Sequence, residues 1–154
     1  MSIEARLLHE PFDPAAELAG LEARGAGAVV SFTGLARGSS RDGAPVLALF
    51  LDHHPRLTQA SLDDAAAAAA RKFELLAVRV LHRCGKVTPG EAIVFVAAAA
   101  EHRRAAFEAV DYLMDRLKTD AVFWKREDRT EGSAWIEPTA ADRAARERWL
   151  EDRD

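Results

Sequence analysis

The stretch LLAVRVLHRCGKVTPGEAIVFVAAAA, residues 75–100, decides the fold. Its two apolar segments, 75–83 and 91–100, are rich in β-branched residues, and the turn residues VTPGE between them predict two consecutive strands. The four alanines at 97–100 do not show where the second strand ends, because alanine favours helices. A pair of strands joined by a short turn is therefore the unit from which the rest of the chain is interpreted.

Helices and further strand pairs flank this unit on both sides. A helix is predicted after Asp13 as cap, ending at Gly25, and another from Thr58 as cap to residue 74. The remaining predicted elements are strands at 27–34, 45–54, 121–128 and 132–138, helices at 102–119 and 139–151, and a mobile loop at 37–44. This order favours a single-domain α+β sandwich with a split βαβ-like core over a doubly wound parallel sheet.

Length and composition are those of an ordinary globular domain. The chain has 154 residues and a net charge of −4, so no overall positive field would attract nucleic acid. No apolar run reaches the roughly 18 residues of a membrane helix, and Glu4 and Arg6 interrupt the N-terminal stretch where a signal peptide would be apolar. We therefore expect a cytoplasmic protein without a membrane partner.

A metal site is not expected from the sequence. Residues 52–54, DHH, suggest metal ligands, but they are adjacent and no distant carboxylate or cysteine completes a set with them. Cys84 is the only cysteine, which excludes an intrachain disulfide and makes a cysteine-based metal cluster implausible. We expect a buried, inert thiol there and neither metal nor cofactor.

Basic residues gather at two places where an anion could bind. His102, Arg103 and Arg104 begin a predicted helix, where cations oppose the helix dipole unless a bound anion compensates them. Arg37 follows a strand and precedes the polar loop. The alternative for both is a solvated surface, and the residues alone leave it open.

Two of the four lysines lie in KTDAVFWKRE, residues 118–127, in a chain that otherwise uses seventeen arginines. A lysine can lose its proton when it is desolvated, whereas an arginine stays charged. Lys118 ends a predicted helix, where a cation is favourable for structural reasons alone. Strand alternation puts Phe123, Lys125 and Glu127 on one face, and Lys125 is either an edge residue, which the local pattern favours, or a desolvated catalytic group.

Four segments in this order resemble the large, catalytic subunits of molybdopterin synthases. They are GAVVSFTGLAR at 27–37, LHRCGKVTPGEAIVFV at 81–96, HRRAAFEAVDYLMDRLKTDAVFWKRE at 102–127, and Trp149 after a charged helix. The resemblance implies an α/β hammerhead fold of two layers and a homodimer within a heterotetramer. It also implies the reaction, in which cyclic pyranopterin monophosphate receives two sulfurs and becomes the dithiolene of molybdopterin. The sulfur comes from the thiocarboxylated Gly-Gly terminus of a small ubiquitin-like subunit.

The same resemblance implies the site residues. Lys118 and Lys125 fall on the catalytic lysines. The residues that fall on substrate-binding positions are Leu35, Ala36, Arg37, His102, Arg103, Arg126 and Glu127. Leu35 departs from the family pattern, where a lysine is common, and so does Arg104, where a small residue is common. A basic pocket suits a substrate with a cyclic phosphate, because negative charge grows when that ring opens.

Two other classes of function compete with this one. A noncatalytic module could hold a phosphorylated metabolite or a protein tail through the same basic residues. A single-protein acyl or phosphoryl transferase is disfavoured, because the chain lacks a glycine-rich phosphate loop and a recognisable nucleophile motif. Loss of affinity rather than turnover on changing Lys118 would indicate the binding module.

Overall fold

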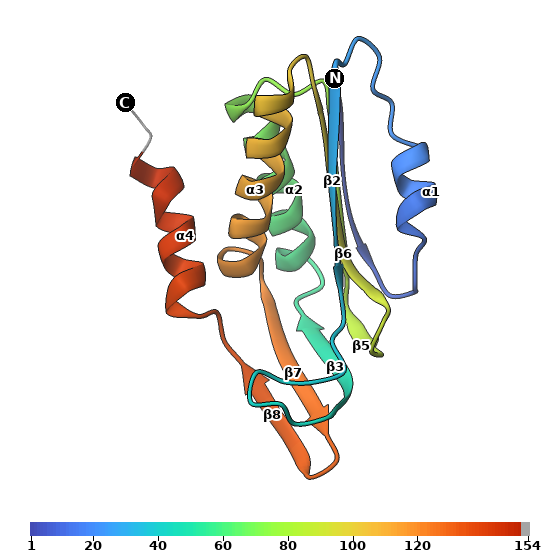
Figure 1. Cartoon of the computed structure of the whole chain (residues 1–154), viewed down its shortest axis with the longest axis vertical. Coiled ribbons are helices and arrows are strands. Elements are labelled where there is room, and N and C mark those ends of the chain that lie inside the picture. The colour runs from blue at the N-terminus through green and yellow to red at the C-terminus, as the bar shows by residue number, and fades with distance from the viewer. Residues whose placement is uncertain (152–154) are drawn as a thin grey trace.

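The computed structural model describes residues 1–151, which form two four-stranded sheets and four helices (Figure 1). The strands are β1 (Ser2–Leu8), β2 (Ala28–Leu35), β3 (Val46–His53), β4 (Ala77–Arg83), β5 (Gly85–Val87), β6 (Ala92–Ala100), β7 (Phe123–Arg129) and β8 (Gly132–Ile136). The helices are α1 (Pro14–Ala19), α2 (Leu57–Lys72), α3 (Arg103–Thr119) and α4 (Ala140–Glu151). The α+β class expected from the sequence is confirmed.

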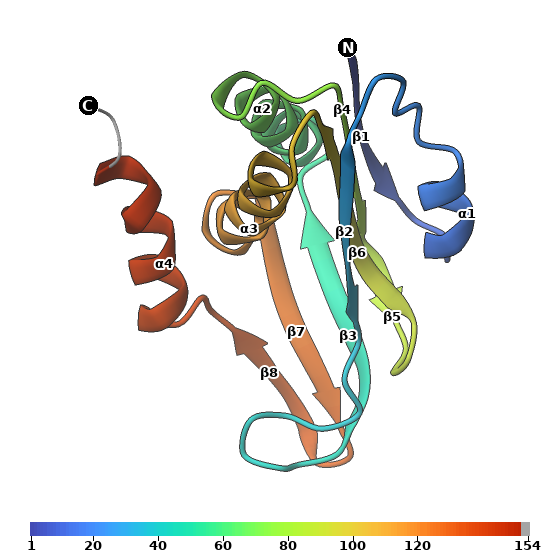
Figure 2. The same cartoon turned by 45° about the horizontal axis from the view of Figure 1, so that its top comes forward.

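The first sheet has the strand order β1-β4-β6-β2 and carries helices on both faces (Figure 2). Only the β1–β4 pair is parallel; the other two pairings are antiparallel. Helices α2 and α3 bury the main core against one face, around Leu62, Val80, Val96 and Leu113. Helix α1 covers the other face, where Leu81 and Phe95 pack with the partly buried Leu21.

The alanine run at 97–100 belongs to strand β6 to its end. Ala97–Ala100 pair with β2 on one side, and Ala97–Ala99 pair with β4 on the other, so the ladder overrides the helix preference of alanine. All four are essentially fully buried. Because the side chains of Ala98 and Ala100 are small, α2 and α3 can pack closely over this part of the sheet.

The second sheet has the order β5-β3-β7-β8 and extends beyond the first (Figure 2). The chain passes from the first sheet to the second directly, because only Cys84 separates β4 from β5. Gly85 has a φ of 77°, which a residue with a side chain rarely adopts, and this allows the abrupt change of direction. A small core around Val46, Leu51 and Ile93 holds this sheet together.

Several sequence predictions were wrong in detail. Strand β1 was missed because Glu4 and Arg6 look like surface residues. In the structure they form ion pairs beneath α1: Arg79 contacts Glu4 at 2.8 Å, and Arg6 contacts Glu17 at 2.8 Å. The three-residue strand β5 was also missed, because pairing with β3 rather than its own composition creates it.

Two predicted helix limits were also wrong. Helix α1 ends at Ala19 rather than near Gly25. The Arg79 guanidinium donates to the Glu17 carbonyl at 2.7 Å, and this carbonyl at the end of the helix would otherwise lack a hydrogen-bond partner. Thr58 is not the cap of α2. It lies inside the helix, fully buried, and its hydroxyl donates to the Val122 carbonyl at 2.6 Å.

Helix α4 packs against α3 through a small aromatic cluster. The Trp149 indole donates to Asp115 at 2.7 Å, and its ring meets Tyr112 and Phe73 edge to face at 5.5 Å and 5.9 Å. Arg146 adds an ion pair to Asp120 at 2.9 Å. This packing fixes the segment between β8 and α4, which contributes to the cavity described below. Over residues 1–151, no helix is long and apolar enough to cross a membrane.

Candidate functional site

A cavity of about 970 Å³ lies where the two sheets, the end of α3 and the start of α4 meet. Its wall includes Lys118 at the end of α3, Phe123, Lys125 and Glu127 on β7, and Asp142 near the start of α4. These three β7 residues, which alternation put on one face, all line the cavity, and Trp124 from the other face lines it as well. The polar loop after β2 supplies part of the opposite wall through Arg37, Ser39, Ser40 and Arg41.

Lys125 is a desolvated lysine in the middle of a sheet. Strand β7 pairs with β3 on one side and β8 on the other, placing Lys125 between Leu51 and Ile136. The interpretation of Lys125 as an edge residue was therefore wrong. Burial lowers its pKa from the ordinary value, and the charge of Lys118 lowers it further, while Glu127 opposes this. A lysine of this kind can exchange a proton nearer to neutral pH than an exposed one.

Lys118 occupies the last turn of α3, and its exposed side chain lines the same cavity. Across the cavity, Asp142 is held by Thr139: their backbone amides and side-chain oxygens exchange two hydrogen bonds of 2.9 Å and 3.0 Å. The bond from the Thr139 amide to the carboxylate lowers the pKa of Asp142, and the charge of Lys118 adds to the effect. Lys118 therefore both stabilises the end of α3 and lines the cavity.

His82 is a cavity residue that sequence reasoning missed. Its ring stacks on Phe123 with centroids 4.1 Å apart, and its Nδ1 lies 2.7 Å from the Arg83 carbonyl. Burial lowers the pKa of His82 to about 4, and the charges of Lys125 and Lys118 act in the same direction. The ring is therefore neutral at pH 7, with Nδ1–H donating to the carbonyl. Its only sequence signal was a polar residue inside an apolar strand.

Only some residues at the end of β2 and in the loop after it line the cavity. Leu35 and Arg37 line the cavity with exposed side chains, whereas Ala36 is buried and holds the loop by exchanging backbone hydrogen bonds with Glu91 and Gly90 at 2.9 Å and 2.8 Å. The loop closes on itself through a 2.8 Å bond between Ser40 and Ala44. Arg41, which sequence reasoning did not select, also lines the cavity, and its charge contributes to lowering the pKa of Lys125.

The two residues after Lys125 lie differently. Glu127 lines the cavity and pairs with Arg129 at 3.0 Å. Arg126 is outside the lining: it pairs with Asp128 at 2.8 Å, and its guanidinium lies 4.8 Å from the Phe50 ring centroid. In this arrangement Arg126 supports the sheet rather than the cavity wall.

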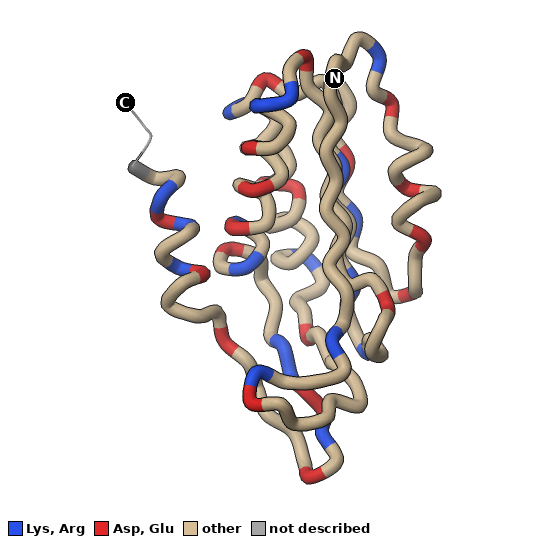
Figure 3. The backbone as a smooth tube through the Cα atoms, in the orientation of Figure 1, with Lys and Arg blue, Asp and Glu red and all other residues tan. Residues whose placement is uncertain are grey.

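His102 and Arg103 are not at this cavity. They line a separate, open hollow of about 660 Å³ with Arg104, Gly27 and Phe107, at the start of α3. Helix α3 runs 15 residues from Arg103 to Lys118, so their backbones are about 22 Å apart. Figure 3 shows basic segments at both ends of α3, far from each other. One chain therefore does not bring the predicted substrate-binding pair to Lys118 and Lys125, the lysines predicted to be catalytic.

Comparisons with known proteins agree with this architecture. Residues 7–120 match the family described as "MoaE protein". The molybdopterin synthase catalytic subunit of Caulobacter vibrioides is 50% identical over 93% of this chain and 95% of its own length. That of Pseudomonas aeruginosa is 47% identical over 95% and 98%. The solved molybdopterin biosynthesis MoaE protein from Burkholderia ambifaria superposes with a TM-score of 0.79 at 37% identity, covering 97% of this chain and 99% of that one.

The match spans most of the chain, and it includes the end of α3 that carries Lys118 together with both strands that flank Cys84. Relatives of nearly equal length show that the whole fold, rather than one motif, is shared. The chain belongs to the MoaE family, the catalytic subunits of molybdopterin synthases.

Proposed function

We propose that this protein is the catalytic subunit of a cytoplasmic molybdopterin synthase, which inserts two sulfurs into cyclic pyranopterin monophosphate to form the molybdopterin dithiolene. The observation that carries the proposal is Lys125, a lysine desolvated at the centre of a sheet and facing the same cavity as Lys118. The relatives that share the fold carry the name of this catalytic subunit. A surface that only bound an anion would not need a lysine whose pKa is lowered.

The lysines supply proton transfer, and the arginines hold negative charge. At neutral pH the lowered pKa of Lys125 gives its amine a larger neutral fraction than an exposed lysine has, so it can accept a proton from the bound substrate. Lys118 lies nearby as an ammonium that can donate a proton to the group that becomes negative on ring opening. Arg37 and Arg41 lie on the loop side of the cavity, where they suit the phosphate of the substrate.

The sulfur comes from a partner. Cys84 is the only cysteine of the chain, it is buried, and it is absent from the cavity lining. A small ubiquitin-like subunit would deliver sulfur on its thiocarboxylated Gly-Gly terminus. Trp124 and Trp135 are more than half exposed at the cavity and offer apolar surface to such a tail.

The basic pair at the start of α3 serves the cavity of a second copy. The separation of about 22 Å along α3 is too long for one small substrate to span. Strand β2 is one of the two edge strands of the first sheet, and it exposes Val29 and Phe32 without any charged residue along its length (Figure 3). Apolar edge strands of this kind favour pairing with another chain. We therefore infer a homodimer in which His102 and Arg103 of one copy complete the site of the other.

Reconstitution tests the function. The purified chain, mixed with a thiocarboxylated small subunit and cyclic pyranopterin monophosphate, should form the dithiolene product, and the chain without the small subunit should form none. Binding of substrate and partner without turnover would indicate the noncatalytic module instead.

Complementation tests the shared site. The variants Lys118→Ala and Arg103→Ala should each be inactive, whereas a refolded mixture should recover about a quarter of the parental activity, because half of the dimers are mixed and each then has one intact site. No recovery, with mixed dimers present, would show that both residues act within one chain.

A further inference from the structure

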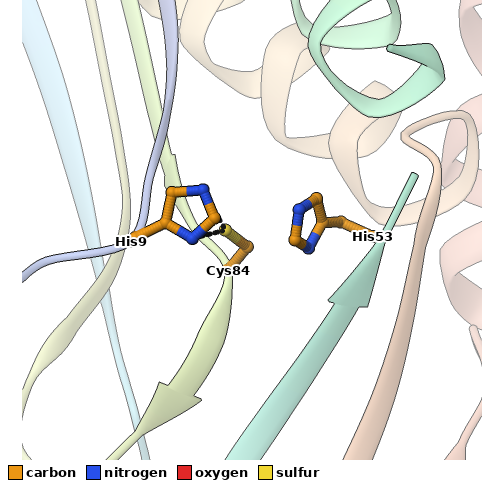
Figure 4. A group of neighbouring side chains, drawn as sticks. All are labelled: His9, His53 and Cys84. Carbon is orange, nitrogen blue, oxygen red and sulfur yellow. Dashed lines mark hydrogen bonds between the residues drawn. The ribbon is translucent and has the colours of Figure 1, made fainter. Parts of the chain in front are cut away.

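Two histidines and the only cysteine lie close together outside the cavity. His9 directly follows β1, His53 is the last residue of β3, and Cys84 is the single residue between β4 and β5. Their ligand atoms all lie within 4.8 Å of one another, and Figure 4 shows His53 facing the other two from across the gap. None of the three lines the cavity that holds the lysines.

The distances are close to those of a metal site. Cys84 Sγ lies 3.3 Å from His9 Nδ1, and a tetrahedral zinc ion bound to both atoms would set them about 3.5 Å apart. The His9 and His53 rings meet edge to face with centroids 5.4 Å apart. Closing the remaining gap requires a side-chain movement of His53 by about 1 Å, which rotation about its side-chain bonds supplies.

The backbone already holds two of the ligands in place. The Cys84 amide donates to the Leu8 carbonyl at 2.9 Å, so the residue after Leu8, His9, is fixed beside the thiol. His53 brings its ring from the other sheet. Over residues 1–151, neither ring nitrogen of His53 has a hydrogen-bond partner, which leaves this imidazole available.

We propose that His9, His53 and Cys84 bind a zinc ion, with water in the fourth position. A thiolate and two imidazoles are the donor set that zinc prefers over magnesium or calcium. When the ion binds, the thiol proton leaves to solvent and a sulfur–zinc bond forms, while two neutral imidazoles each donate a lone pair. No oxidation or reduction is involved.

The surroundings do not make Cys84 a reactive thiol. Burial raises the pKa of Cys84, although the nearby Arg83 opposes this, so the free thiol is protonated and unreactive at neutral pH. A zinc ion stabilises the thiolate directly and displaces the proton. The sequence-based expectation of no metal failed to consider His9 and His53 together, because 43 residues separate them in the chain.

The position suggests a structural role for the metal. His9 extends from the first sheet, His53 belongs to the second, and Cys84 lies at the passage between them. A metal bound to all three would therefore clamp the two sheets together. The cavity is built from both sheets, so the clamp would preserve its shape without touching the substrate. This inference does not depend on the proposed function.

Metal titration tests the proposal on the tag-free full chain. After treatment with a chelator, the protein should bind one zinc ion per chain in calorimetry and gain thermal stability in its presence. Cobalt(II) should give the thiolate-to-metal charge-transfer band that reports a sulfur ligand. Cys84→Ser and His53→Gln should each weaken zinc binding by at least about 100-fold, more than loss of an outer hydrogen bond to a ligand does.

His54→Asn is the matched control. The Nδ1 of His54 already accepts backbone hydrogen bonds from Arg56 and Leu57 at 3.2 Å and 3.1 Å, and asparagine can replace that capping role. This variant should bind zinc like the parent. Absence of stoichiometric binding, or binding that Cys84→Ser leaves unchanged, would overturn the proposal and leave a hydrogen-bonded thiol. Zinc binding that depends on His54 would do the same.

Discussion

Replacing Lys118 with arginine separates the charge of this residue from its chemistry. Lys118 lies in the last turn of α3 and its side chain is exposed, so arginine can be accommodated without displacing core residues. Within residues 1–151 the lysine forms no ion pair or side-chain hydrogen bond that the change would break. The positive charge, and with it the effect on the pKa of Lys125, is retained.

The expected magnitudes for folding and turnover differ sharply. Either cation suits the C-terminal end of the helix, so the free energy of unfolding should change by only a few tenths of a kcal/mol. That corresponds to a shift in Tm of about 1 °C for a domain of this size. Turnover should fall at least about tenfold, equivalent to about 1.4 kcal/mol of transition-state stabilisation, because a guanidinium cannot release a proton and is larger.

Single-turnover kinetics with saturating thiocarboxylated partner measure this loss without interference from partner binding. The companion variant Lys118→Met removes the charge, so the pKa of Lys125 should rise and the limb of the pH–rate profile that reports it should move to higher pH. In Lys118→Arg that limb should stay where it is in the parent. A Lys118→Arg rate within twofold of the parent would refute the catalytic assignment and leave Lys118 as a helix-end cation.

Three further outcomes are expected. Lys125→Met should abolish turnover yet raise Tm at pH 7, since the folded state disfavours the charged amine. This gain in Tm should shrink as pH rises toward 10.5, where the lysine loses its charge in the unfolded chain as well. Thermal melts across that range measure it, and a constant difference in Tm would contradict the reasoning. Trp149→Ala should weaken the packing of α4 on α3, at a cost smaller than the about 3–5 kcal/mol for removing a fully buried aromatic side chain. Limited proteolysis should then cut α4 faster while the rest of the chain resists. Arg103→Ala should weaken substrate binding in calorimetry with an unchanged Tm, because its side chain is exposed at the start of α3; equal affinity would count against an anion site there.

Local patterns predicted most elements correctly, and they failed where neighbours in space decide the outcome. The strands at 75–83 and 91–100 and the helix at 102–119 were found from apolar periodicity, because each buries a face that its own sequence marks. Strand β1 was missed because its charged residues are paired under α1 rather than solvated. Strand β5 exists only through its partner β3.

The site shows the same division. The sequence by itself determined the family, the fold class and the choice of Lys118 and Lys125 as chemically unusual residues, since those depend on residue type and order. Only the tertiary structure decided that Lys125 lies at the centre of a sheet, that His82 joins it, and that His102 and Arg103 lie at the far end of α3. It alone brought His9, His53 and Cys84 together. The physical reason is that desolvation and convergence depend on which distant strands pair, and a linear pattern carries no record of that pairing.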